Sequence, residues 1–297
     1  MGLLIRGGTL LTMDEAGGFQ GDLKTRSSVV VEVTAYPLHI EPDDDDVILE
    51  AEGLYVIPGM IDPFVSTNGE DDTYIARIAM GAGITSALIW DTSDHCSLFS
   101  QGGRCLSSFL RINPAQFTDN QLDGHLQHAK ENDLTPVIDI QTESMGIRTL
   151  LSIRRTDTKP ILFRLSGCAA LVEAIAETGC PVVPAPYGMC GSSPWQMAAR
   201  FAERGVQTAL TCAYPYTMMK HLPLCASLCI REGMDRTKAL RAITSTPASL
   251  LGLSNAGKLA PGCQADICIY DGDPLLVASS LVMTIINGKI YRKSTYR

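Results

Sequence analysis

Short apolar segments alternate with polar turns at both ends of the chain. Glycine pairs and the acidic run Asp43–Asp46 separate these segments near the N-terminus. Close to the C-terminus, Asn287-Gly288 is a strong signal for a two-residue hairpin turn. The pattern therefore predicts β-strands at both ends, over 3–5, 28–33, 47–49, 266–270 and 283–286.

Between residues 58 and 257 the apolar segments become longer and alternate with amphipathic helical stretches. Apolar strands that alternate with helices are typical of a parallel sheet covered on both faces. We predict strands over 60–65, 84–90, 105–112, 136–141, 160–165, 181–186 and 206–212. A (β/α) barrel needs an eighth strand, so that strand is short or missing, and about 200 residues lies at the lower edge of barrel size.

Composition narrows the classes of protein to consider. Hydrophobic residues make up 45% of the chain and charged residues 19%, which is enough apolar side chain for a full core. The formal charge of -8 argues against nucleic acid or an anionic membrane as a partner, because both need a basic surface. We found no apolar run of membrane-spanning length and no signal-peptide pattern, so we expect a cytoplasmic protein. The 10 cysteines contain no C-x-x-C pair, and we interpret most of them as reduced core residues.

Several ordered motifs resemble the amidohydrolase superfamily, especially its imidazolonepropionase-like branch. The similar segments are 55–63 (YVIPGMIDP), 81–86 (GAGITS), 246–253 (TPASLLGL), 257–262 (GKLAPG), 265–267 (ADI), 271–274 (DGDP) and 286–289 (INGK). The resemblance implies an α/β fold, with a distorted (β/α) TIM-like barrel over 58–257 and a composite β-sandwich domain from 1–57 and 258–297. It also implies a nominal class, the metal-dependent hydrolases that act on carbon-nitrogen bonds other than peptide bonds.

The same resemblance indicates where metal ligands would lie, and the residues there are unsuitable. The family's first barrel strand ends Asp-x-His-x-His, whereas this chain has Asp62-Pro63-Phe64-Val65-Ser66. Phe64 has no lone pair, and Ser66 is a poor ligand for a transition metal. The remaining ligand positions correspond to Ile140, Leu165 and the region of Cys212. No lysine lies between Lys24 and Lys130 to act as a bridging ligand, so we expect no metal and no other cofactor.

Polar residues near the predicted strand ends are candidates for a pocket: Asn68, Asp91, His95, Gln141, Tyr187, Tyr214 and His221. Asp91, Asp94, His95 and Cys96 could form a rebuilt metal site with Cys212 and His221, although an ordinary polar loop is the more economical interpretation. We expect Arg164 to point into the helix layer if Leu165 points inward. His125 and His128 fit a solvated helical face better than a metal site, and Asp43–Asp46 fits a solvated charge run better than a calcium loop.

Three functional hypotheses remain open at this stage. The first is a non-catalytic homologue that binds a small-molecule ligand or assembles as a homo-oligomer, or as a hetero-oligomer with an active paralogue. The second is an enzyme that works without metal through Cys212, His95 or Asp91. The third is a rebuilt-site hydrolase acting on a small cyclic amide or a related molecule.

Overall fold

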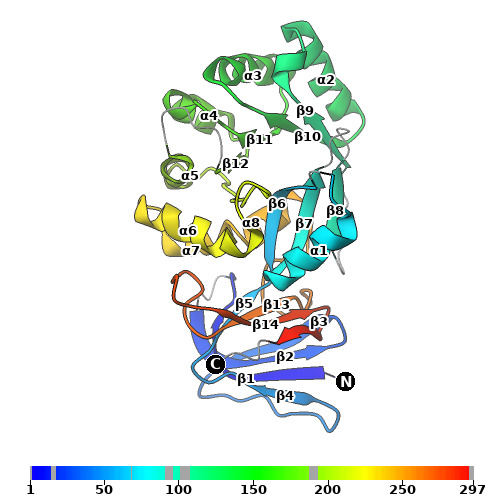
Figure 1. Cartoon of the computed structure of the whole chain (residues 1–297), viewed down its shortest axis with the longest axis vertical. Helices are drawn as coiled ribbons and strands as arrows, with labels where there is room; N and C mark the ends of the chain where they lie inside the picture. Colours follow the sequence, from blue (N-terminus) through cyan, green and yellow to red (C-terminus); the bar gives the residue numbers. More distant parts are fainter. Residues whose placement is uncertain are drawn as a thin grey trace.

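The computed structural model describes residues 2–14, 18–67, 69–90, 96–100, 108–186 and 193–293. One eight-stranded sheet contains strands from both ends of the chain and forms the lower part of the molecule in Figure 1, in blue and red. Its order is β15-β14-β13-β5-β1-β2-β3, and β4 pairs with β1. The strands are β1 (Gly2–Leu11), β2 (Gly18–Arg26), β3 (Val29–Ala35), β4 (Val47–Glu50), β5 (Tyr55–Pro58), β13 (Ile267–Tyr270), β14 (Leu281–Ile286) and β15 (Lys289–Lys293).

The two ends of the chain join where β13 pairs antiparallel with β5, so that Ile269 lies opposite Val56. Strand β1 pairs with two strands along the edge opposite β2: its first half pairs with β4 and its second half with β5. A register shift between Ile5 and Gly8 separates these halves, and Gly7 there has a φ of 75°. Such a bulge bends a strand and lets it change partner.

The middle of the chain forms two smaller sheets surrounded by helices. The first contains β6 (Met60–Ser66), β7 (Ile84–Trp90) and β8 (Cys96–Ser100), in which β6 and β7 are parallel and β8 is antiparallel to β7. The second has the order β12-β11-β10-β9 with all pairs parallel, from β9 (Ser108–Ile112), β10 (Leu134–Asp139), β11 (Ile161–Arg164) and β12 (Val182–Pro184). The prediction of parallel strands covered by helices is confirmed.

The segment 206–214, which follows helix α5 (Pro194–Glu203), links the two smaller sheets through isolated bridges. Thr208 bridges to Val182 of β12, and Tyr214 bridges to Val65 of β6. We predicted a regular strand over 206–212, and this prediction is wrong, because only the single bridge of Thr208 forms within that range. The antiparallel β8 was also not predicted, and part of the strand expected over 105–112 lies outside the described residues.

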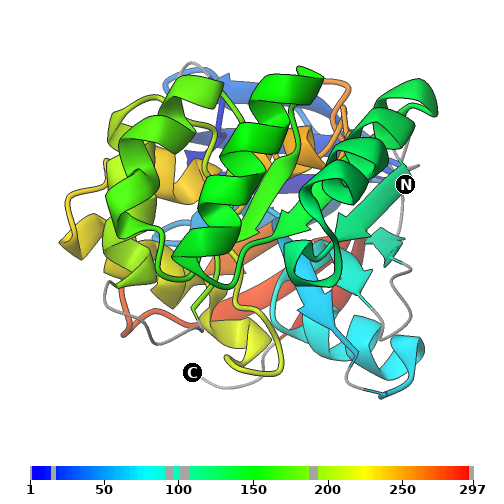
Figure 2. The same ribbon diagram turned by 90° about the horizontal axis from the view of Figure 1, so that it is seen from above.

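Helices cover the outside of the smaller sheets, and Figure 2 shows several of them side by side above the strands. No helix among the described residues is long and apolar enough to cross a membrane. The helices are α1 (Asp72–Gly81), α2 (Asp119–Glu131), α3 (Glu143–Thr156), α4 (Val172–Thr178), α5 (Pro194–Glu203), α6 (Leu222–Arg231), α7 (Arg236–Arg241) and α8 (Ser245–Leu250), with 3-10 turns at Pro114–Gln116, Ala169–Leu171 and Met219–His221.

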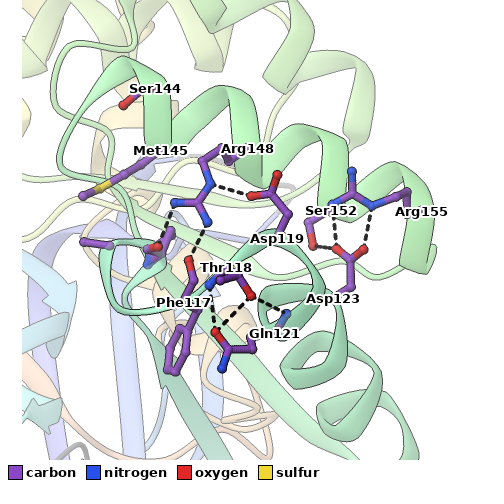
Figure 3. Close-up of polar contacts among 12 residues, drawn as sticks. Phe117, Thr118, Asp119, Gln121, Asp123, Ser144, Met145, Arg148, Ser152 and Arg155 are labelled. Carbon is purple, nitrogen blue, oxygen red and sulfur yellow. Dashed lines mark hydrogen bonds and ion pairs between the residues drawn. The ribbon is translucent and has the colours of Figure 1, made fainter.

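Two arginines of α3 fasten this helix to α2 and to the turn before it (Figure 3). Arg155 pairs with Asp123 through both Nε and Nη2, at 2.6 and 2.9 Å. Arg148 Nε lies 2.6 Å from Asp119 Oδ1, and its Nη2 donates to the carbonyl of Phe117 at 2.5 Å. Planar, bidentate pairs of this kind fix orientation, so the helix pair supports β9 and β10 from outside.

The acidic run of the sheet domain is not simply solvated, and that prediction is wrong. Lys24 Nζ lies 2.9 Å from Asp43 Oδ2 and 3.0 Å from Asp46 Oδ2. Arg26 contacts Asp43 as well. The run therefore neutralises two cations of β2 and ties its loop to the sheet.

Candidate functional site at the barrel end

Side chains alternate between two environments along β10, β11 and β12. One set points into the space between the smaller sheets and packs with Phe64, Leu88 and Trp90. This inner set comprises Val137, Ile161, Phe163, Val183 and Ala185. The other set packs against residues of the surrounding helices, such as Leu150 and Phe201. It contains Ile138, Ile140, Leu162, Leu165 and Val182.

Ile140 and Leu165 thus belong to the helix-facing layer and not to the pocket. We expected both at ligand positions of the barrel interior, whereas the structure packs both against the surrounding helices. The residues at the ends of the two strands are Asp139 and Arg164. A shift of one residue moves a strand side chain to the opposite face, which explains the error.

The end of β11 has an uncommon backbone. Arg164 and Leu165 have φ values of 70° and 62°, in the left-handed region that non-glycine residues rarely adopt. Leu165 is fully buried, while the Arg164 side chain reaches Asp139 and remains 18% exposed. The expectation that Arg164 points into the helix layer is therefore reversed.

Three aromatic rings fill the interior below these charged residues. Phe64 stacks on Phe163 with 4.0 Å between ring centroids and on Trp90 with 5.4 Å. The Trp90 Nε1 donates to the Pro63 carbonyl at 3.3 Å. A residual cavity of about 10 Å³ remains beside Trp90 and Phe163, and its other walls are apolar. Space of this size holds at most about one water molecule, so this cavity among the described residues is too small for a substrate.

Asp139 is the centre of a charged cluster above the aromatic rings. It is 1% exposed, and Arg164 contacts both of its oxygens, Nε to Oδ1 at 2.7 Å and Nη2 to Oδ2 at 2.8 Å. Arg111 Nη2 donates to Oδ2 at 3.2 Å, and the Gln141 amide donates to the same oxygen at 3.3 Å. Each guanidinium also lies over a ring, Arg111 over Trp90 and Arg164 over Phe163.

A second buried carboxylate, Asp62 of β6, is held by the segment that bridges the sheets. The Cys212 backbone N–H donates to Asp62 Oδ2 at 3.1 Å, and the Cys212 thiol donates to it at 2.8 Å. The Phe64 N–H donates to Oδ1 at 3.0 Å. Burial raises the pKa of Asp62, and burial together with the neighbouring Asp62 raises the pKa of the Cys212 thiol well above its ordinary value. Cys212 is therefore a buried hydrogen-bond donor.

The other predicted pocket residues lie in different places. Ser66 donates its N–H to the Tyr214 carbonyl at 3.0 Å, and the Tyr214 hydroxyl donates to Glu70 at 3.0 Å. Burial and Glu70 raise the pKa of Tyr214. His221 lines a separate cavity together with Lys220 and Tyr270. Asn68, Asp91, His95 and Tyr187 lie outside the described residues.

The described donor groups at the barrel end are already engaged by other groups of the chain. Phe64 and Phe163 supply no ligand atom, Asp139 is engaged by two guanidinium groups, and Asp62 is engaged by Cys212. A catalytic zinc requires three protein ligands and an open fourth position. In the described part of the chain, the one cluster of three or more His, Cys, Asp or Glu side chains close enough to share an ion is Asp43, Asp45 and Asp46, in the sheet domain.

Comparison with known proteins places these features in a family context. The model of the amidohydrolase family matches residues 195–292. An imidazolonepropionase from Salinispora tropica is 37% identical over 82 residues, which is 27% of this chain and 21% of that protein. Amidohydrolase tasK from Hapsidospora irregularis is 35% identical over 75 residues, 25% of this chain and 8% of that protein. The matched part thus spans about a fifth or less of these relatives.

Solved structures match over nearly the whole chain at low identity. An amidohydrolase from Thermotoga maritima has a TM-score of 0.82 and 15% identity, covering 98% of this chain and 100% of that one. A Xaa-Pro dipeptidase with bound methionine has a TM-score of 0.77 and 13% identity, covering 98% and 100%. Molinate hydrolase has a TM-score of 0.75 and 13% identity, covering 97% and 94%. These similarities establish the fold.

Proposed function

We propose that this chain is a metal-free member of the amidohydrolase superfamily that acts by binding and not by hydrolysis. The observation that carries the proposal is the packing of the barrel end, where stacked aromatic rings and an arginine-carboxylate cluster contact one another directly. A metal hydrolase needs ligands around an open position for water, and this packing supplies neither.

The electrostatics of the barrel end support the same proposal. Two guanidinium groups already compensate the buried carboxylate of Asp139, so a divalent cation there would meet two positive charges within the same cluster. Such like-charge contact disfavours cation binding strongly in a partly buried site. The family match at 195–292 lies outside the segments that carry Phe64, Asp139 and Arg164, so it places no ligands at this end.

Metal-independent catalysis through Cys212 has less support than binding. The thiolate is the nucleophilic form of cysteine, and reactive cysteines have lowered pKa values and partial exposure. Cys212 is fully buried, and its pKa is raised.

Metal content of the purified protein tests the proposal. We expect well under one equivalent of zinc, iron or manganese per chain after purification without chelator, and no hydrolysis of a panel of small cyclic amides. Stoichiometric metal that survives dialysis, together with metal-dependent hydrolysis, would refute it.

Two variants identify the source of any metal that is found. Asp45→Asn removes a carboxylate of the acidic run in the sheet domain, and His95→Ala removes a candidate ligand of a rebuilt site. Loss of metal and of hydrolysis in His95→Ala would establish a rebuilt site. Loss of metal in Asp45→Asn alone would locate the ion on the acidic run and leave the proposal intact.

A further inference from the structure

A cavity of about 470 Å³ lies at the junction between the helical part of the chain and the composite sheet. It lies among the end of α1, the start of α6 and the loop that connects β13 to β14. This loop begins with the Asp271-Gly272-Asp273-Pro274 motif. Ligand cavities in proteins commonly measure roughly 300–1,000 Å³, so the space suits a small molecule.

The cavity is lined by apolar side chains and by three serines, Ser227, Ser279 and Ser280. Tyr270 and Leu275 line it and are 4% and 5% exposed, and Pro223, Pro274 and Leu281 add further apolar surface. The rim carries large hydrophobic side chains in contact with solvent, since Leu276 is 59% and Val277 is 84% exposed. Exposed apolar side chains gathered around a cavity favour an apolar ligand.

The cavity walls are held in place by hydrogen bonds across the junction. The Ser227 hydroxyl of α6 donates to the Leu275 carbonyl at 2.6 Å, which ties α6 to the loop. Within the loop, the Ser280 N–H donates to Asp271 Oδ1 at 2.6 Å, and the Leu275 N–H donates to Asp273 Oδ1 at 3.0 Å. The cavity is therefore formed before any ligand binds.

The charged residues that line the cavity are all basic. Lys220 and His221 line it, no carboxylate does, and the chain as a whole has a formal charge of -8. Among the described residues, Lys220 has no carboxylate partner, whereas Asp273 of the neighbouring loop is paired with Arg236 at 2.7 Å. An unpaired lysine beside an apolar cavity suits an anionic group.

The position of the exposed Lys220 at the start of α6 strengthens the argument. Lys220 and His221 belong to the turn directly before α6, at the end of the helix where the macrodipole is positive. Anions are stabilising at that end and cations are not. The local arrangement is therefore unfavourable until a negative charge is present. Local conflicts of this kind are expected at functional sites.

We propose that this junction cavity binds an amphipathic carboxylate, with the carboxylate at Lys220 and His221 and the apolar body against Leu275 and Tyr270. The site is separate from the barrel end, so the inference does not depend on whether the barrel end is metal-free. Ligands of this class have an anionic head group and an apolar chain of moderate length.

Isothermal titration with decanoate tests the proposal, with decyltrimethylammonium as the probe of opposite charge and equal chain length. We expect saturable 1:1 binding of decanoate and none of the cationic probe. Lys220→Glu should weaken decanoate binding at least about tenfold, because it replaces an attractive charge beside the carboxylate by a repulsive one. Lys289→Glu, the same charge change on an exposed lysine of β15, should leave it within about twofold.

A second variant keeps the test independent of Lys220. Val277→Asp alters an 84% exposed rim residue, so folding should be preserved while a carboxylate is placed at the cavity mouth, and decanoate should bind more weakly. Absence of decanoate binding, equal binding of both probes, or equal affinity in wild type and Lys220→Glu would each overturn the proposal.

Discussion

Restoring the first-strand histidines by Phe64→His with Ser66→His tests whether the barrel end can still accept a metal. Phe64 is 5% exposed and lies between two rings, at 4.0 Å from Phe163 and 5.4 Å from Trp90. We expect no zinc binding, because two imidazoles leave the site short of a third ligand while Asp139 remains paired with arginines.

The magnitude of the stability loss follows from the packing. Truncating a buried Phe to Ala typically costs about 3–5 kcal/mol, and an imidazole recovers part of the lost contacts. It also buries polar nitrogens in a cavity whose walls are apolar, at a cost of roughly 1–3 kcal/mol when they remain unpaired. We therefore expect the double variant to be about 2–4 kcal/mol less stable than the wild type.

The assay is a urea unfolding midpoint alongside a zinc titration of the same sample. Ser66→His alone is the control, because Ser66 is only half-buried and its loss removes no aromatic contact. If the double variant unfolded at the wild-type midpoint and bound zinc at micromolar or tighter affinity, the pocket would be open and other ligands would be in place. That result would refute the reasoning about the barrel end.

Three further predictions concern stability. Arg164→Gln should lower the free energy of unfolding by about 1–3 kcal/mol, because Asp139 keeps only Arg111 as a cationic partner. The control Arg154→Gln, on the exposed face of α3, should change it by less than about 0.5 kcal/mol. Equal effects of the two variants would contradict the role of the Asp139 cluster. Deleting 258–297 should give insoluble protein, because β5 loses β13, and a soluble, cooperatively unfolding product would disprove this. Burial acts to raise the pKa of Asp22, but hydrogen bonds from Ile40, Gly7 and Tyr36 lower it overall. Asp22→Asn should therefore lower the free energy of unfolding by ~2–4 kcal/mol near pH 7. This difference, measured from denaturation midpoints, should shrink as the pH falls below 3.8, and a pH-independent difference would contradict the prediction.

Local motifs allowed the turns to be predicted, because they depend on a few neighbouring residues. Asn287 and Gly288 have φ values of 51° and 70° and connect β14 to β15 as the hairpin signal indicates. Gly252 follows Leu251, the C-cap of α8, and has a φ of 71°, as expected for a residue that ends a helix. Gly59 is required by close packing, since a Cβ there would lie 2.3 Å from the Thr85 hydroxyl.

Features that depend on distant residues were missed. Strand β2 contains Asp22 and Lys24, which look like surface residues in the sequence, yet both are buried in the sheet. Asp22 accepts from the Gly7 N–H and the Tyr36 hydroxyl, each at 3.0 Å, and Lys24 pairs with the acidic run. Buried charged groups are stable only when paired, and sequence patterns do not show partners 14 or more residues away.

The one-residue error at Ile140 and Leu165 has a physical origin and a chemical consequence. Matching apolar residues to the family's histidines placed the barrel interior on the wrong face of β10 and β11, and the left-handed backbone at Arg164 could not be predicted from its residue type. In the structure, the side chains at the interior-facing ends of these two strands are Asp139 and Arg164, in place of the apolar Ile140 and Leu165.

A buried carboxylate at a barrel end needs positive charge, and in a metal hydrolase the metal ion can supply it. Arg164 and Arg111 supply it here through contacts of 2.7 to 3.2 Å. Each guanidinium also covers an aromatic ring, so the same side chains compensate Asp139 and cap the stack formed with Phe64. Arginine suits this double role because its charge is permanent and its plane both pairs with a carboxylate and lies over a ring. The chain's own residues therefore compensate the charge of Asp139 at the barrel end.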